Sequence, residues 1–173
     1  MKPATLPKAP THDFTVRGAL RCAVQGRLDV WVHAYLDAAG VFHKDLDKDR
    51  DYHERLAAWF DREERFWTGP LEMPLSRLIR RVGPEAAMPW KEPRETWERR
   101  VTAIQDAFKD PSGLPPMIAR AVAPEPGEEA GAFRLLLNDG AHRHEALKRL
   151  GETTFWVILW FDSAAQQRAF LAD

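Results

Sequence analysis

Apolar residues in the first part of the chain recur at the spacing of an α-helix. One set predicts a helical segment that Asp13 caps, Gly26 divides and Gly40 ends. A second set predicts another amphipathic helix. Residues 13–68 are therefore expected to form an N-terminal helical extension whose aromatic side chains pack on the rest of the chain, with a partner-binding face as the alternative. The first set is Leu20, Val24, Leu28, Trp31, Val32, Tyr35 and Leu36, and the second is Tyr52, Leu56, Trp59, Phe60, Phe66 and Trp67.

Polar segments border these helices. Residues 1–12 contain three prolines in their first ten positions and are expected to be a disordered tail. Four aspartates alternate with other residues between the two helical sets, as in some calcium-binding loops. Counting from Asp45, however, Arg50 takes the place of the required glycine and Leu56 that of the bidentate glutamate, so a solvated charged turn is expected. The four are Asp45, Asp47, Asp49 and Asp51.

Beyond residue 68 the pattern changes to alternating strands and helices. Short apolar runs predict strands at 71–74, Met117–Val122 and 133–137, the last two as the arms of a hairpin. The run 153–161 is apolar on both faces, which predicts a central strand that is covered on each side.

Helices are expected between and after these strands. Pro93 suits the first position of a helix, and four apolar residues follow it at helical spacing. Ser163 is expected to cap a last helix that reaches Leu171. Residues 69–173 are therefore expected to form one α/β domain. The four apolar residues are Trp97, Val101, Ile104 and Phe108.

Composition narrows the functional classes. The chain has 173 residues, enough for one domain with a full core, and its formal net charge of -1 gives no electrostatic case for duplex DNA. Its single cysteine, Cys22, excludes an internal disulfide framework and fits a cytoplasmic protein. The first ten residues lack the apolar core of a secretory signal, and the longest apolar run, 155–161, is too short to cross a bilayer. No membrane partner is therefore expected.

The segment with the most chemical information runs from residue 135 to Gly151. It reads as a short apolar strand, a turn at Asp139 and Gly140, and a helix that Gly151 ends. Asp139 is expected to cap this helix, and His142 and Arg143 fall in its first turn. Because a helix start favours anions and arginine matches phosphate geometry, the turn is a candidate phosphate site. Capping alone is the alternative.

The sequence Asp-Gly-Ala-His-Arg at 139–143 resembles the DGxHR-type signature of the ParB/sulfiredoxin-like superfamily. Residues 71–75, 114–118 and 156–159 are similar to strands that flank this signature, so the resemblance covers about 69–162. It implies a small mixed sheet with flanking helices, to which the N-terminal helical extension is an addition.

The turn looks most similar to that of the serine kinases of this superfamily. The resemblance implies a nucleoside triphosphate, ATP or CTP, with magnesium, and a kinase or phosphohydrolase acting on a small molecule. Phosphate binding is then expected at Gly140, Ala141, His142 and Arg143. Asp139 is expected to be catalytic.

The resemblance also implies an acidic residue after the first strand that works with Asp139. Glu85, Glu92 and Glu95 compete for this catalytic role, and Glu85 is preferred because it lies nearest to the end of the strand. The alternative for each of them is a solvent-exposed carboxylate.

Departures from the family pattern keep other functions open. Ala141 stands where sulfiredoxins carry a cysteine, and about a dozen residues follow the last strand, too few for a helix-turn-helix DNA reader. The two alternatives are a DNA-associated or nuclease-like protein and a non-catalytic regulatory or interaction module.

Two further groups of residues are candidates for a site. His142 and His144 point to different sides of a helix, which disfavours a zinc site. The arginines Arg77, Arg80 and Arg81 are expected to form an exposed basic turn.

Overall fold

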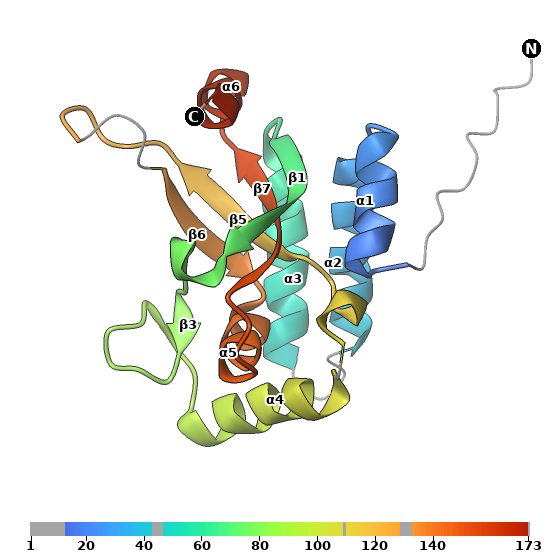
Figure 1. Cartoon of the computed structure of the whole chain (residues 1–173), viewed down its shortest axis with the longest axis vertical. Coiled ribbons are helices and arrows are strands. Elements are labelled where there is room, and N and C mark those ends of the chain that lie inside the picture. The colour runs from blue at the N-terminus through green and yellow to red at the C-terminus, as the bar shows by residue number, and fades with distance from the viewer. Residues whose placement is uncertain (1–12, 43–46, 109, 129–132, 173) are drawn as a thin grey trace, which may run out of the picture.

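The computed structural model describes residues 13–42, 47–108, 110–128 and 133–172, with backbone alone for 39–42 and 47–53. These residues form a five-stranded mixed sheet in the order β1-β7-β5-β6-β2, with a separate parallel pair of β3 and β4 (Figure 1). The strands are β1 (Phe66–Pro74), β2 (Leu78–Ile79), β3 (Val82–Gly83), β4 (Trp90–Lys91), β5 (Met117–Val122), β6 (Arg134–Asp139) and β7 (Thr154–Phe161). The expected α/β class, with a small mixed sheet, is confirmed.

The helices surround this sheet. They are α1 (Val16–Val24), α2 (Leu28–Phe42), α3 (Asp47–Arg62), α4 (Arg94–Ala107), α5 (Ala141–Arg149) and α6 (Ala164–Ala172), with 3-10 turns η1 (Leu75–Arg77) and η2 (Pro111–Gly113). The helices expected after Pro93 and Ser163 are confirmed, since Pro93 is the N-cap of α4 and the hydroxyl of Ser163 accepts from the amide of Gln166. In the described residues no helix combines the length and apolar character needed to cross a membrane.

The N-terminal helices differ from the prediction in their boundaries. Gly26, with φ 66°, divides α1 from α2 as expected. Thr15 rather than Asp13 caps α1, because the Thr15 hydroxyl accepts from the amide of Gly18. Helix α2 continues past Gly40. The aspartates from Asp47 onward belong to α3 rather than to a turn, while Asp45 and the predicted tail lie outside the described residues.

Strand β1 begins earlier than the sequence pattern indicated. Phe66 and Trp67 were expected at the end of a helix, but they pair with Phe161 and Trp160 of β7. This expectation is wrong because two adjacent aromatic residues fit both a helix and a strand, and only the antiparallel partner β7 decides between them. Strands β5, β6 and β7 lie where the sequence placed them, with β5 and β6 antiparallel.

The central strands bury both faces, and alternate residues face different helices. Val157 and Leu159 of β7 pack in a cluster with Leu147 of α5, whereas Ile158 and Trp160 pack with side chains of α1, α2 and α3. Because successive strand residues point to opposite faces, the sheet separates two cores. Figure 1 shows α4 and α5 at one end of the sheet and α6 at the other.

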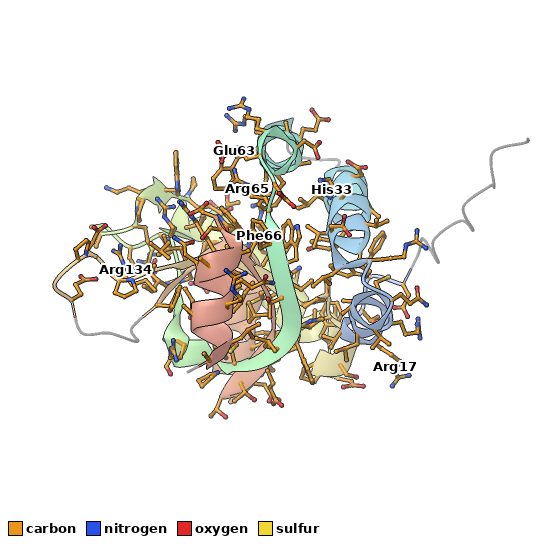
Figure 2. The ribbon with its side chains drawn as sticks, turned by 90° about the horizontal axis from the view of Figure 1, so that it is seen from above. Arg17, His33, Glu63, Arg65, Phe66 and Arg134 are labelled. Carbon is orange, nitrogen blue, oxygen red and sulfur yellow. The ribbon has the colours of Figure 1, made fainter. Side chains whose placement is uncertain are left out.

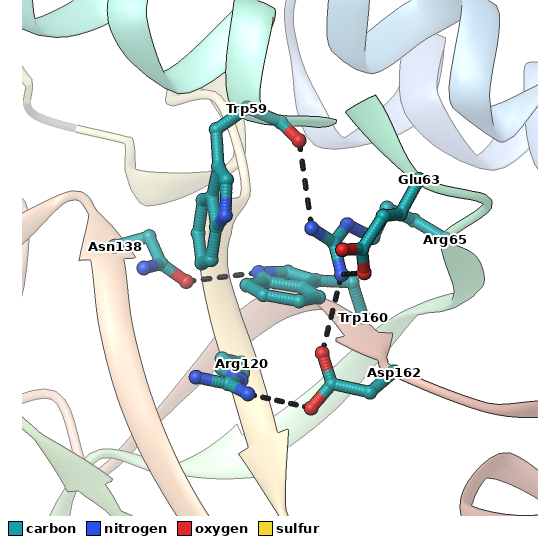
Figure 3. Close-up of polar contacts among 7 residues, drawn as sticks. All are labelled: Trp59, Glu63, Arg65, Arg120, Asn138, Trp160 and Asp162. Atoms are coloured by element: carbon teal, nitrogen blue, oxygen red, sulfur yellow. Dashed lines mark hydrogen bonds and ion pairs between the residues drawn. The ribbon is translucent and has the colours of Figure 1, made fainter. Parts of the chain in front are cut away.

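A cluster of side chains around Trp160 connects the helical extension to the sheet, and Figure 3 shows its polar contacts. The guanidinium carbons of Arg65 and Arg120 lie 5.1 Å and 5.3 Å from the centroid of the Trp160 ring, and Trp59 of α3 contacts its edge. Both arginines also hold Asp162, with N–O distances of 3.2 Å and 2.6 Å. Figure 2 shows Arg65 between the end of α3 and the start of β1. These contacts join the extension to β5 and β7 through cation–π and ionic interactions.

Replacing Ile158 with alanine tests whether the extension and the sheet share one core. Ile158 is fully buried against the N-terminal helices, so Ile158→Ala is expected to lower the free energy of unfolding by about 2–5 kcal/mol. Urea unfolding followed by circular dichroism measures this, with exposed Leu171→Ala as the control. A variant that unfolds in two separated transitions, or that loses no stability, would contradict the shared core.

Candidate functional site

Helix α5 begins at a glycine-hinged corner directly after β6. Gly140 is its N-cap residue with φ 108°, a left-handed conformation that residues with side chains rarely adopt. A Cβ added there would lie 2.6 Å from Cγ of Met117, so the corner has no room for a side chain. The N-cap residue makes no side-chain capping hydrogen bond. The expectation that Asp139 is the N-cap is therefore wrong, because Gly140 takes that position and Asp139 is the last residue of β6.

Asp139 and Arg143 form a largely buried ion pair that Tyr35 of α2 closes. Nη2 of Arg143 donates to Oδ2 of Asp139 (2.7 Å), and Nη1 donates to the Tyr35 hydroxyl (2.8 Å). That hydroxyl donates to the same Oδ2 (2.9 Å). The side chains of Asp139 and Arg143 are 11% and 12% exposed. The predicted site residues Asp139, Gly140 and Arg143 therefore meet, but the guanidinium points into the protein.

The pKa shifts in this network keep its proton arrangement fixed. Burial raises the pKa of the Tyr35 hydroxyl well above its ordinary value, so Tyr35 remains a donor to Asp139 at neutral pH. Burial alone would lower the pKa of Arg143, but its partners Tyr35 and Asp139 more than offset this and raise it. The guanidinium therefore stays charged.

Tyr35 is the residue of this network that sequence reasoning missed. It was predicted only as one member of an apolar stripe, which its stacking on Trp31 at 5.2 Å between ring centroids bears out. The available signal was its hydroxyl, since a buried tyrosine O–H usually requires a hydrogen-bond partner. The identity of that partner, more than a hundred residues away, is not visible in the sequence.

His142 points to a different set of partners. Its Nε2 donates to Oε2 of Glu92 (2.6 Å), whose Oε1 accepts from Nη1 of Arg100 (2.8 Å). Burial raises the pKa of Glu92, but its hydrogen bond with His142 and the charges of His142 and Arg100 more than offset this, so the pKa lies below its ordinary value. Glu92 rather than the preferred Glu85 thus contacts the turn. Glu95 lies exposed in the first turn of α4.

Glu85 is connected to His142 indirectly, through Arg80 and Trp97. It forms an ion pair with Arg80, whose guanidinium carbon lies 4.6 Å from the centroid of the Trp97 ring. That ring lies 4.7 Å from the ring of His142. The expectation of an exposed basic turn is wrong for Arg80, since its side chain is only 12% exposed. The reason is the aromatic face of Trp97, which the turn packs against.

The second histidine of the motif is structural. His144 is buried, and its Nε2 donates to the carbonyl oxygen of Leu75 (2.8 Å). Burial lowers its pKa, so it remains neutral. The following helix buries Ala146 and Leu147 as predicted, whereas Leu150 is exposed because α5 ends at Arg149.

The carboxylates at the turn do not fit a dedicated magnesium site. One oxygen of Glu92 accepts from His142 and the other from Arg100, and Oδ2 of Asp139 accepts from both Arg143 and Tyr35. Within the described ranges, no group of three or more histidine, cysteine, aspartate or glutamate side chains is placed to hold a metal ion. The expected magnesium ion therefore finds no ligand set made from these side chains alone.

The coupling between Tyr35 and Asp139 can be measured with a double-mutant cycle. Tyr35→Phe is expected to cost about 1–3 kcal/mol, because it leaves buried partners unsatisfied. With Asp139→Asn, the cycle is expected to give a coupling of at least about 0.5 kcal/mol by urea unfolding. Tyr35→Phe combined with Leu171→Ala serves as the additive control, because Leu171 belongs to α6, which Figure 1 shows at the other end of the sheet from α5. Additivity of Tyr35→Phe and Asp139→Asn would rule out this hydrogen bond.

The lowered pKa of Glu92 predicts an acid-dependent contribution to stability. Its folded pKa lies below the ordinary value of 4.5, so the contribution is complete above that value and is lost as the pH falls through the lowered pKa. Glu92→Gln is therefore expected to lose less stability than the wild type between about pH 6 and about pH 3. Urea midpoints across this range measure the difference, with exposed Glu95→Gln as the matched control. Identical pH dependence in the wild type and Glu92→Gln would contradict the pairing.

Comparison with known proteins leaves the chain without a family assignment. No protein-family model matches it, and no curated protein is significantly similar to it. The resemblance to the ParB/sulfiredoxin-like superfamily, and the expectations of a nucleotide, a cytoplasmic location and an enzymatic role, therefore stay predictions.

Proposed function

We propose that this chain binds a nucleoside triphosphate at the start of α5, as a ParB/sulfiredoxin-like kinase or phosphohydrolase that acts on a small molecule. One observation carries the proposal: α5 starts at a glycine without a side-chain cap and has His142 and Arg143 in its first turn. The first amides of a helix lack acceptors within the helix, and the helix dipole makes them favourable to an anion. Phosphate oxygens supply the missing acceptors.

In this proposal the amides of Ala141 and His142 and the ring of His142 bind the phosphate oxygens. The His142 side chain is 22% exposed. Gly140 contributes the left-handed turn that directs these amides, a conformation that its lack of a side chain permits. Arg143 was expected to hold phosphate oxygens directly. Because its Nη atoms donate to Tyr35 and Asp139, it acts here as a positioning residue that holds the turn in place.

Phosphoryl transfer from ATP or CTP would depend mainly on positioning and charge neutralisation. Asp139 is the proposed base for an acceptor hydroxyl, which requires its carboxylate to exchange the hydrogen bond from Tyr35 for one from the substrate. Glu92 orients His142, and Glu85 holds Arg80 beside Trp97. Because the side chains at the turn do not form a magnesium site, no step is assigned to a metal.

A non-catalytic regulatory or interaction module is the second candidate. The closure of the Asp139–Arg143 pair by Tyr35 favours it, since three polar groups that hydrogen-bond to one another need no ligand to balance their charges. Saturable nucleotide binding separates the two candidates, because only the first requires it.

Equilibrium titration with ATP, CTP and GTP, with and without magnesium, tests the proposal. The wild type is expected to bind at least one of them saturably. His142→Ala is expected to weaken that binding about 10- to 100-fold, because it removes a hydrogen bond to a charged phosphate.

His33→Ala is the matched control, since His33 also contacts a carboxylate, that of Asp61 at 2.8 Å, but lies on α2. Its nucleotide affinity is expected to equal that of the wild type. Absence of saturable binding to every nucleotide, or equal losses in the two histidine variants, would overturn the proposal.

A further inference from the structure

The chain between β2 and α4 holds an exposed tryptophan on a hydrogen-bonded backbone. Trp90 is 64% exposed, and among the tryptophans that the structure describes it is the one in the exposed class. Its amide donates to the carbonyl of Arg81 (3.0 Å), and the amide of Glu92 donates to that of Gly83 (3.0 Å). The backbone is therefore held in place by β3, while the ring itself remains in solvent.

Such a ring is suited to binding. A tryptophan offers a large flat surface, and a fixed backbone reduces the conformational entropy that binding removes. Buried tryptophans such as Trp97 and Trp160 stabilise the fold, but an exposed ring contributes little to it. The exposure of Trp90 is thus not explained by packing within the described residues.

The surrounding segment is cationic. Residues 77–94 contain five arginine or lysine residues and two glutamates, in a chain with a formal net charge of -1. Lys91 and Arg94, next to the tryptophan, are exposed. An aromatic face beside cations suits a ligand that combines a flat ring with negative charge.

Trp90 also lies close to the start of α5 along the chain. Two residues that are two positions apart have Cα atoms at most about 7 Å from each other. Glu92 is two positions after Trp90, directly beyond β4, and its carboxylate contacts His142 in the first turn of α5. The residue that carries the exposed ring is therefore a near neighbour of a side chain at the proposed phosphate-binding turn.

We propose that Trp90 stacks on the base of the nucleotide whose phosphates bind at the start of α5. The inference rests on the proposed function and adds the residue that recognises the base. A free nucleotide fits better than single-stranded nucleic acid, because a strand requires successive stacking platforms. In the described part of the chain Trp90 is the exposed aromatic residue, so it offers one such platform.

Binding of ATP compared with binding of inorganic tripolyphosphate tests this inference. Both ligands present a phosphate chain, but only ATP presents a base. Trp90→Ala is expected to weaken ATP binding about 5- to 100-fold, whereas tripolyphosphate affinity stays within about twofold of the wild type. Trp90→Phe, which keeps an aromatic face, is expected to bind ATP more tightly than Trp90→Leu, which keeps only apolar bulk. In the wild type, ATP but not tripolyphosphate is expected to quench the fluorescence of Trp90.

The outcomes distinguish a failure of the stacking role of Trp90 from a failure of the proposed nucleotide binding. If the wild type binds ATP and Trp90→Ala binds it equally well, the base platform is overturned and the proposed function stands. If the wild type binds neither ATP nor tripolyphosphate, the stacking role of Trp90 and the proposed function are both overturned. If an oligonucleotide binds much more tightly than ATP and Trp90→Ala abolishes that binding, the surface serves single-stranded nucleic acid and the inference is overturned. Unchanged tripolyphosphate binding by Trp90→Ala also shows that the variant is folded.

Discussion

The ion pair of Asp139 and Arg143, closed by the Tyr35 hydroxyl, is the constraint on which the rest of the site depends. Two charged groups that are mostly removed from water require partners, because an unpaired buried charge is strongly unfavourable. Here the partner comes from α2, more than a hundred residues earlier in the chain. The N-terminal helices are therefore part of the architecture of the turn. The same helices share a core with Ile158 and Trp160, so polar and apolar contacts fix them in one position.

This arrangement also explains which features of the fold the sequence predicted. Strand β7 and the hairpin of β5 and β6 were predicted well, because long apolar runs and alternating patterns are local signals. The helix α5 was predicted from its glycine-hinged start for the same reason. The segment at Phe66 was assigned to a helix, because its strand character comes from pairing with β7, which the local pattern does not contain.

The candidate site was predicted in its local part and missed in its long-range part. Asp139, Gly140, His142 and Arg143 are neighbours in sequence, and the structure keeps them together at one turn. Their partners could not be read from the sequence. In the sequence, Tyr35 is one member of an apolar stripe. Local spacing does not distinguish Glu85 from Glu92 as partners of the turn. Only the structure, in which β4 pairs with β3, places Glu92 beside His142. Long-range hydrogen bonds have no signature in local residue spacing.

The first turn of α5 directs the side chains of His142 and Arg143 to different partners. Consecutive residues of an α-helix point about 100° apart, so His142 and Arg143 do not share partners. Arg143 faces the interior and neutralises Asp139, while His142 faces Trp97 and Glu92. Arg143 pairs with Asp139 and Arg100 pairs with Glu92, so each carboxylate is matched by positive charge before any ligand arrives. A phosphate in the proposed complex would therefore gain little from net charge at the turn and more from the uncapped amides of α5, whose direction is fixed. Recognition there would depend on the geometry of the anion, and the inward ion pair would serve it by holding those amides in place.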